Sequence, residues 1–142
     1  MEDLNVKDLR FGNLVKTVLT DEYHILDIYD LRVISEGNYQ NSYNPDIKVF
    51  KPIRLNRDYL LNLGFEQCGY NLLYWRHPRL YNIEFAGINW ADEEFPEYQF
   101  LNAEIYGNLI KIDYVHQIQN FFNILTDEEL DISLFSVDDL DK

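Results

Sequence analysis

One segment near the end of the sequence, residues 114–125, limits the fold more than any other. Its apolar side chains recur at offsets of 4, 7, 8 and 11 residues from the first, in the order Tyr114, Ile118, Phe121, Phe122 and Leu125. An α-helix turns once in about 3.6 residues, so these offsets place all five side chains in one stripe. We predict an amphipathic helix here, buried along that stripe.

The opposite face of this predicted helix is polar but carries no formal charge. It consists of His116, Gln119, Asn120 and Asn123. A solvated helix face in an acidic chain would ordinarily carry Glu and Lys. We interpret this face as a candidate contact surface for a protein partner, with His116 and Asn120 as its site residues.

The composition is that of a chain that can fold. Its 142 residues suit one compact domain, and its 11 Tyr, 9 Phe and 2 Trp supply apolar surface that disordered segments lack. The longest apolar runs are far shorter than the roughly 18 residues of a membrane span, so we expect a soluble, cytoplasmic protein. Cys68 is the single cysteine, which excludes an intramolecular disulfide and a cysteine-based zinc site.

The net charge of −13 is concentrated in the last third of the chain. Residues 1–50 carry 5 basic and 9 acidic side chains, residues 51–90 carry 5 and 3, and residues 91–142 carry 2 and 13. Such acidity repels nucleic acid and membranes and attracts basic partners. Solubility is the alternative explanation of the same charge.

Local patterns predict an N-terminal module of strands over residues 1–50. Residues 14–19, 23–29 and 31–35 have the β-branched and aromatic content of three short strands, which suggests a β-meander of SH3-like type. Residues 36–46 contain Gly and Pro and show no periodicity, so we expect a loop there, and residues 47–50 form a possible fourth strand.

A second module is predicted over residues 51–142. Asn56 can cap a short helix that ends at Gly64, the glycine being suited to a left-handed terminator. Residues 71–75 and 80–85 read as a hairpin, and residues 98–101, 103–106 and 109–112 as further strands. Cys68 is expected in a turn, and an acidic tail follows the last helix. The class is therefore α+β, with antiparallel strands and a packed C-terminal helix, in one compact domain.

Three stretches resemble a group of small uncharacterised proteins of bacteria and their prophages. They are Asp8-Leu-Arg-Phe-Gly-Asn-Leu-Val15, Pro52-Ile-Arg-Leu-Asn-Arg-Asp-Tyr-Leu-Leu-Asn-Leu-Gly-Phe65 and Tyr114-Val-His-Gln-Ile-Gln-Asn-Phe-Phe-Asn-Ile-Leu-Thr-Asp-Glu-Glu-Leu130. The resemblance brings no assigned activity. It implies the context of a phage or mobile-element accessory protein in a bacterial host, a class in which some members inhibit host enzymes or defences.

No motif for catalysis, a cofactor or a metal is found. His24, His77 and His116 lack metal-ligand spacing, and the glycines are scattered singly rather than gathered in a phosphate loop. Asp27 and Asp30 show no contrast of environment that would set up acid–base chemistry. We expect a protein that is not an enzyme and has no cofactor.

The acidic side chains of the last third are the main candidate for a binding surface. The candidates are Asp92, Glu93, Glu94 and Glu97, with Asp127, Glu128, Glu129 and Asp131 and the tail residues Asp138, Asp139 and Asp141. Thr126 and Glu129 have the spacing of a capping box, which would explain part of this charge. The remainder predicts a mimic of a phosphate array that occupies a nucleic-acid channel on another protein. The context that the resemblance implies makes a host defence nuclease the expected target, in the manner of an anti-CRISPR protein.

The basic residues support an alternative function. The basic concentration of residues 51–90 consists of Lys51, Arg54, Arg57, Arg76 and Arg79, with Tyr74, Trp75 and His77 among them. This mixture can stack bases and neutralise phosphates. The protein would then bind RNA or single-stranded DNA. The opposing interpretation buries Trp75 in the core and pairs the arginines with the acidic third.

Overall fold

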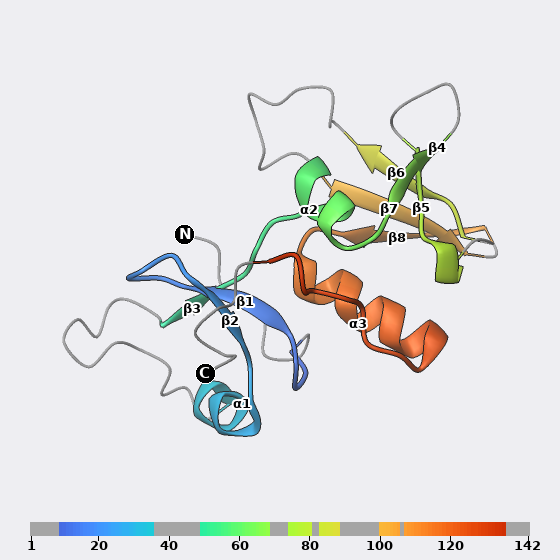
Figure 1. Cartoon of the computed structure of the whole chain (residues 1–142). Helices are drawn as coiled ribbons and strands as arrows, with labels where there is room; N and C mark the ends of the chain where they lie inside the picture. The colour runs from blue at the N-terminus through green and yellow to red at the C-terminus, as the bar shows by residue number, and fades with distance from the viewer. Residues whose placement is uncertain are drawn as a thin grey trace.

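The computed structural model describes residues 9–35, 49–68, 74–80, 83–88, 100–105 and 107–135. Two antiparallel sheets and three α-helices are found in these ranges. The helix α3 (Val115–Thr126) runs under the larger sheet and beside the smaller one (Figure 1). The predicted α+β class and the packed C-terminal helix are confirmed.

The smaller sheet is built from the N-terminal part of the chain, as predicted. It has the strand order β2-β1-β3, with β1 at Leu14–Thr17, β2 at Tyr23–Ile25 and β3 at Phe50–Lys51. The first two strands form a hairpin, and β3 pairs with the other edge of β1, where Lys16 lies opposite Lys51. The predicted boundary at residues 50 and 51 therefore falls inside a strand.

The strand predicted over residues 31–35 is wrong, because these residues belong to the helix α1 (Ile28–Ser35). The strand predicted over residues 23–29 is confirmed only for Tyr23–Ile25, since Ile28 and Tyr29 already lie in α1. The Asp27 side chain accepts a hydrogen bond of 2.7 Å from the Asp30 backbone N–H, and the Asp30 side chain accepts one of 3.0 Å from the Asp27 N–H. This reciprocal capping satisfies two N–H groups that a helix start leaves unpaired. The Asp30 N–H also lowers the pKa of Asp27.

The short predicted helix is confirmed as α2 (Arg57–Asn62). The Asn56 side chain caps it by accepting a hydrogen bond of 2.8 Å from the Tyr59 N–H. Gly64 has a φ of +89°, and the Phe65 N–H donates back to the Leu60 carbonyl over 3.0 Å. The glycine is needed because this termination requires the left-handed conformation.

The larger sheet has the strand order β4-β5-β6-β7-β8. The strands are β4 (Glu66–Cys68), β5 (Tyr74–Arg76), β6 (Phe85–Ile88), β7 (Phe100–Ile105) and β8 (Asn108–Ile112). The predicted hairpin is confirmed as the pair β5 and β6, joined through the 3-10 helix η2 (Pro78–Leu80). Cys68 lies in an edge strand, so the predicted turn is wrong, and the strands predicted on either side of residue 102 are one strand.

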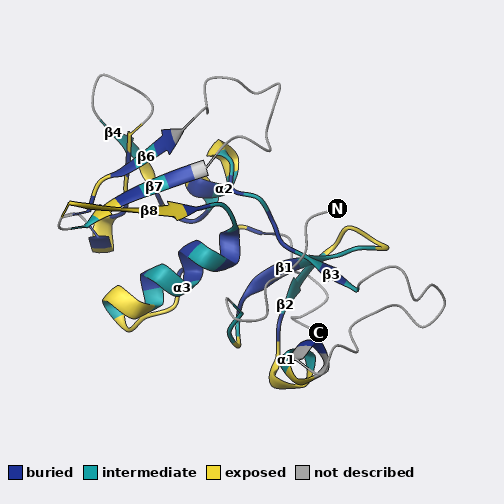
Figure 2. Cartoon of the chain, turned by 180° about the vertical axis from the view of Figure 1, so that it is seen from behind, coloured by how far each residue is buried: buried dark blue, intermediate teal, exposed yellow. Residues whose placement is uncertain are grey.

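The main core lies between the larger sheet, α2 and α3. Trp75, Phe85, Leu60 and Ile118 are each fully buried in it, and the β1 residue Leu14 joins the same cluster. Val15, Leu26, Ile34 and Phe50 form a smaller core under α1. Figure 2 shows the buried length of α3 and its exposed C-terminal end.

Two predicted segments cannot be compared with the structure, and the predicted lack of a membrane-spanning helix can be compared only for the described residues. The predicted loop over residues 36–46 and the acidic tail after residue 135 lie outside the described residues. Among the helices that are described, none is both long enough and apolar enough to cross a membrane.

Candidate functional site

The polar face of α3 is turned inward. His116 and Gln119 are each 1% exposed. The Gln119 Oε1 accepts a hydrogen bond of 2.7 Å from the Leu14 backbone N–H, and its Nε2 donates one of 3.2 Å to the Gly12 carbonyl. The uncharged amides of this face therefore bind the polypeptide backbone at the entrance of β1.

Asn120 extends the same internal contact. Its Oδ1 accepts hydrogen bonds of 2.7 Å from Asn13 Nδ2 and 3.0 Å from Arg10 Nε. The prediction that His116 lies on an exposed partner surface is wrong, and Asn120 is half-buried in an internal network. A helix face without charge is expected not only at a partner surface but also where the face is buried. Neutral amides can be buried because hydrogen bonds to backbone groups satisfy them, whereas buried charges are far more costly.

The C-terminal end of α3 is acidic, and this arrangement is electrostatically unfavourable. All of α3 is described, and its last turn holds no basic residue. Asp127 ends the helix in the left-handed conformation, with a φ of 57°, and Glu128 and Glu129 follow it. The C-terminal end of a helix carries partial negative charge, so acids there repel it, whereas Lys or Arg would stabilise it.

The predicted capping box at Thr126 is not formed. Thr126 is the last residue of α3, and its Oγ1 donates to the Phe122 carbonyl over 2.8 Å and accepts from the Glu128 N–H over 3.1 Å. The Glu129 carboxylate instead receives two hydrogen bonds from Arg10, of 2.7 and 3.0 Å. The negative charge at this end is therefore not explained by starting another helix.

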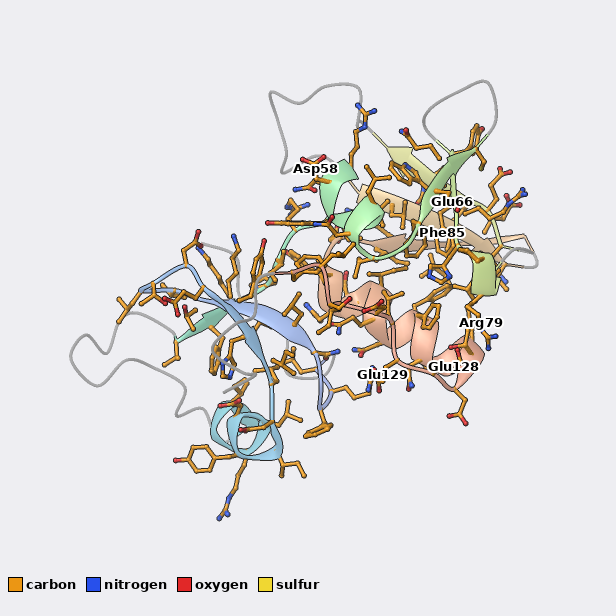
Figure 3. The ribbon with its side chains drawn as sticks, in the orientation of Figure 1. Asp58, Glu66, Arg79, Phe85, Glu128 and Glu129 are labelled. Atoms are coloured by element: carbon orange, nitrogen blue, oxygen red, sulfur yellow. The ribbon has the colours of Figure 1, made fainter. Side chains whose placement is uncertain are left out.

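Two arginines contact this acidic end. Arg79 Nη2 lies 2.9 Å from Glu128 Oε1, and both side chains are more than half exposed. The second pair, between Arg10 and Glu129, is bidentate, and Glu129 is 61% exposed. Exposed ion pairs contribute only about 0–1 kcal/mol each. Figure 3 shows Arg79, Glu128 and Glu129 together at the end of the helix.

Exposed apolar side chains adjoin these acids. Ile124 and Leu125, in the last turn of α3, are 81% and 44% exposed. The predicted burial of Leu125 is therefore wrong, because the apolar stripe extends past the end of the core. We call Ile124, Leu125, Asp127, Glu128 and Glu129 the α3 acidic end. Sequence reasoning missed Ile124, although its offset of 10 residues from Tyr114 places it off the apolar stripe, and that is the signal of an exposed apolar residue.

The remaining acidic candidates divide into two groups. Asp92, Glu93, Glu94 and Glu97 lie outside the described residues, as do Asp138, Asp139 and Asp141, so their role stays a prediction. Asp131 is exposed, and its side chain accepts a hydrogen bond of 2.9 Å from the Ser133 N–H, which lowers the pKa of Asp131.

The basic candidates do not form one surface with an aromatic platform. Trp75 is 0% exposed, so its ring lies in the core and offers no face for a base. Arg54 lies 3.7 Å from Asp113, and Arg79 pairs with Glu128. Arg57 on α2 and Arg76 on β5 are exposed. The interpretation that buries Trp75 and pairs arginines with the acidic third is confirmed for Arg54 and Arg79.

The histidines take structural positions. His24 Nε2 lies 2.8 Å from Asp30 Oδ2, and the His24 ring stacks on Phe50 at 4.9 Å between centroids. His77 packs edge-on against Phe65 and Phe122, and burial lowers the pKa of His77. Across the part of the chain that the structure describes, no three His, Cys, Asp or Glu side chains gather as metal ligands.

Comparison of the chain with models of protein families, with curated proteins and with solved structures finds no match.

Proposed function

We propose that the protein acts by binding another protein, as a non-enzymatic inhibitor or adaptor of the kind that phages and mobile elements carry. The α3 acidic end is its contact surface, and the partner presents a basic surface. The observation that supports this proposal most is the accumulation of Asp127, Glu128 and Glu129 at the negative end of α3. Folding gains little from charges placed there.

The acids at the end of α3 destabilise the fold, and the two neighbouring arginines offset only part of this effect. A charge near a helix end contributes about 0.3–1 kcal/mol, and here the sign is unfavourable. The left-handed Asp127 adds backbone strain, since only Gly adopts this conformation freely. Arg10 and Arg79 neutralise Glu129 and Glu128 only through exposed pairs. A cationic partner would relieve the repulsion that remains.

The chemistry of the surface suits a basic partner that has apolar contacts as well. Ile124 is 81% exposed beside the acids, and such a side chain can supply the apolar centre of an interface while charges on its rim steer the approach. Proteins that handle nucleic acids carry such basic surfaces. The proposed partner is therefore a nucleic-acid enzyme, such as a host defence nuclease, blocked by an acidic mimic of its substrate.

The test compares two sets of neutralised variants of equal charge. In the first, Asp127→Asn, Glu128→Gln and Glu129→Gln are combined with Ile124→Ala. In the control, Asp58→Asn, Glu66→Gln and Glu104→Gln remove the same charge elsewhere; Figure 3 shows Asp58 and Glu66 on α2 and β4, away from Glu128. Each protein is used to capture partners from a bacterial lysate at low and high salt, and captured proteins are identified by mass spectrometry.

We expect the wild-type protein to capture a basic nucleic-acid enzyme at low salt and to release it at high salt. Binding should fall about tenfold or more in the first set, because the loss of even one hydrogen bond to a charged group costs about 1.5–3 kcal/mol, and should stay within twofold in the control. Equal retention by both sets would contradict the proposal. Retention of labelled RNA by the purified protein, lost in Arg57→Ala with Arg76→Ala, would favour direct nucleic-acid binding instead.

A further inference from the structure

A cationic pocket lies on the side of the smaller sheet that faces the connection to α2. Its volume is about 320 Å³, and its lining residues come from β1, the connection between β1 and β2, β3, the segment that leads into α2, and α2 itself. Three of them are basic, namely Lys16, Lys51 and Arg54, and one is acidic, namely Asp21. This excess of positive charge stands out in a chain whose net charge is −13.

The two lysines are held together by the strand register. Lys16 on β1 is directly opposite Lys51 on β3. Like charges opposite each other on neighbouring strands repel, so this pair destabilises the sheet unless an anion lies between the ammonium groups. Asp21 supplies one carboxylate for both, with Oδ2 3.6 Å from Lys16 Nζ and Oδ1 2.7 Å from Lys51 Nζ. One carboxylate neutralises only one of the two lysines.

Arg54 adds the third positive charge and is fixed by the fold. Its guanidinium lies over the Tyr114 ring at 5.3 Å, and its Nη1 is 3.7 Å from Asp113 Oδ1. The residues on either side of Arg54 bind the entrance of α3, because the Val115 N–H donates to the Ile53 carbonyl and the Leu55 N–H donates to the Asp113 carbonyl. The pocket wall is therefore anchored to the central helix.

The neutral part of the lining includes an aromatic group. Pro52 and Ile53 are buried, and Tyr59 and Asn56 are half-buried. The Tyr59 hydroxyl accepts a hydrogen bond of 3.1 Å from the Tyr23 hydroxyl. Burial, and then the contact with Tyr59, raise the pKa of Tyr23 to about 12. A phenol is neutral at pH 7 even at its ordinary pKa of about 10, so Tyr23 adds no negative charge near the lysines.

We propose that this pocket binds a phosphomonoester, with Lys16, Lys51 and Arg54 as the donors to its terminal oxygens. A phosphomonoester carries nearly two negative charges at pH 7 and three strong acceptor oxygens. The lining holds three cations and one carboxylate, and although Asp113 behind the lining pairs with Arg54, the two lysines share only Asp21. Arg and Lys are the residues that bind phosphate. The volume lies at the lower end of the range of about 300–1,000 Å³ for small-molecule sites, which fits a sugar phosphate or a nucleoside monophosphate.

Asp21 is the internal competitor for this ligand. It occupies the position between the lysines, and it is itself 61% exposed. An incoming phosphate must share the lysine N–H groups with the carboxylate or displace it. Removing the charge of Asp21 should therefore strengthen binding, whereas a role of the lysines in structure alone gives no such effect.

The first experiment measures binding by isothermal titration calorimetry at low ionic strength. The probes are inorganic phosphate, ribose 5-phosphate and AMP, with adenosine as the matched uncharged compound. Tighter binding of ribose 5-phosphate or AMP than of inorganic phosphate supports an esterified ligand, whereas equal affinity for all three phosphates contradicts the phosphomonoester and assigns the site to free phosphate. The proposal is overturned if none of the phosphates binds or if adenosine binds as tightly as AMP.

The second experiment repeats the titration with three variants. Lys51→Gln should weaken phosphate binding about tenfold or more, because a hydrogen bond to a charged group is worth about 1.5–3 kcal/mol. Asp21→Asn should strengthen it about threefold to tenfold, and Asn tolerates the left-handed backbone at position 21, where φ is 56°. Arg32→Gln removes an exposed cation outside the pocket and should leave affinity within twofold. Equal affinities in Lys51→Gln and Arg32→Gln, or weaker binding in Asp21→Asn, would overturn the proposal.

Discussion

Two sides of α3 face the interior of the molecule, and they contact their neighbours through different interactions. Toward the larger sheet the helix packs apolar side chains, with Phe122 against His77 at 4.9 Å between ring centroids. Toward the smaller sheet it presents the amides of Gln119 and Asn120, which form hydrogen bonds with the turn before β1. One side gains free energy mainly from burial, and the other mainly satisfies polar groups.

The difference shows how one helix can serve two sheets. Apolar packing is roughly proportional to the area buried and tolerates small shifts along the helix axis. Hydrogen bonds from Gln119 to the Leu14 N–H and the Gly12 carbonyl require one register. We infer that the sheet side supplies most of the stability and the amide side fixes how the smaller sheet is placed.

The largest expected effect comes from Phe122→Ala on the sheet side. Phe122 is 3% exposed, and truncating such a side chain removes its transfer free energy and leaves a cavity. The free energy of unfolding should fall by about 3–5 kcal/mol in urea denaturation. Ile124→Ala, at a position 81% exposed, is the control and should change it by less than about 0.5 kcal/mol. Equal losses in both variants would contradict the assignment of faces.

A smaller loss is expected from Gln119→Leu on the amide side. The change keeps the side chain bulky but leaves the Leu14 N–H, at a fully buried residue, without its acceptor. Unfolding free energy should fall by about 1–3 kcal/mol. The Leu14 amide should also exchange faster with deuterium, measured by NMR. If the amide stayed protected, the hydrogen bond would not be what orders this junction.

The smallest effect is a pH dependence that arises on the sheet side. Burial lowers the pKa of His77 in the folded state, so below the ordinary value of 6.5 the unfolded chain binds a proton that the folded chain does not. Stability from neutral His77 is therefore present above that value and is lost as the pH falls toward the folded-state pKa. His77→Asn should remove this part of the decline between pH 7 and 5, measured as the difference between urea titrations of the two proteins. Parallel curves would show that His77 does not titrate in this window.

The elements with a strong local signal could be predicted from the sequence. The stripe through Ile118 and Phe122 has the helical period, and α3 forms over nearly those residues. Asn56 and Gly64 mark the two ends of α2 by hydrogen-bonding and backbone geometry that depend only on nearby residues. In both helices the local preference agrees with the packing.

The errors occur where tertiary contacts or a weaker cap decide the outcome. Residues 31–35 are rich in β-branched residues, yet the pair Asp27 and Asp30 starts a helix before them, and that spacing is visible in the sequence. β4 was missed because Glu66–Cys68 has little strand preference and pairs only at a sheet edge. His116 is 1% exposed on the same face as Gln119, which binds residues about a hundred positions away in sequence, and no local pattern reports the burial of that face.

The candidate site shows the same division. The acidity after Thr126 is plain in the sequence, whereas the pocket depends on the register that brings Lys16 opposite Lys51. That register joins strands separated by residues 18–49, so spacing alone gives no sign of it. The distribution of charge along the chain could be read from the sequence, whereas the positions of the charged groups in space could not.

The hydrogen bond between Leu14 and Gln119 also governs when the protein can finish folding during synthesis. The two residues are separated by 105 positions. At about 5–20 residues per second, the ribosome needs roughly 5 to 20 s to add the helix after the hairpin of β1 and β2 has emerged. During that interval the Leu14 N–H and the Gly12 carbonyl lack the Gln119 amide as their partner. The N-terminal hairpin therefore cannot complete its packing until α3 has been synthesised.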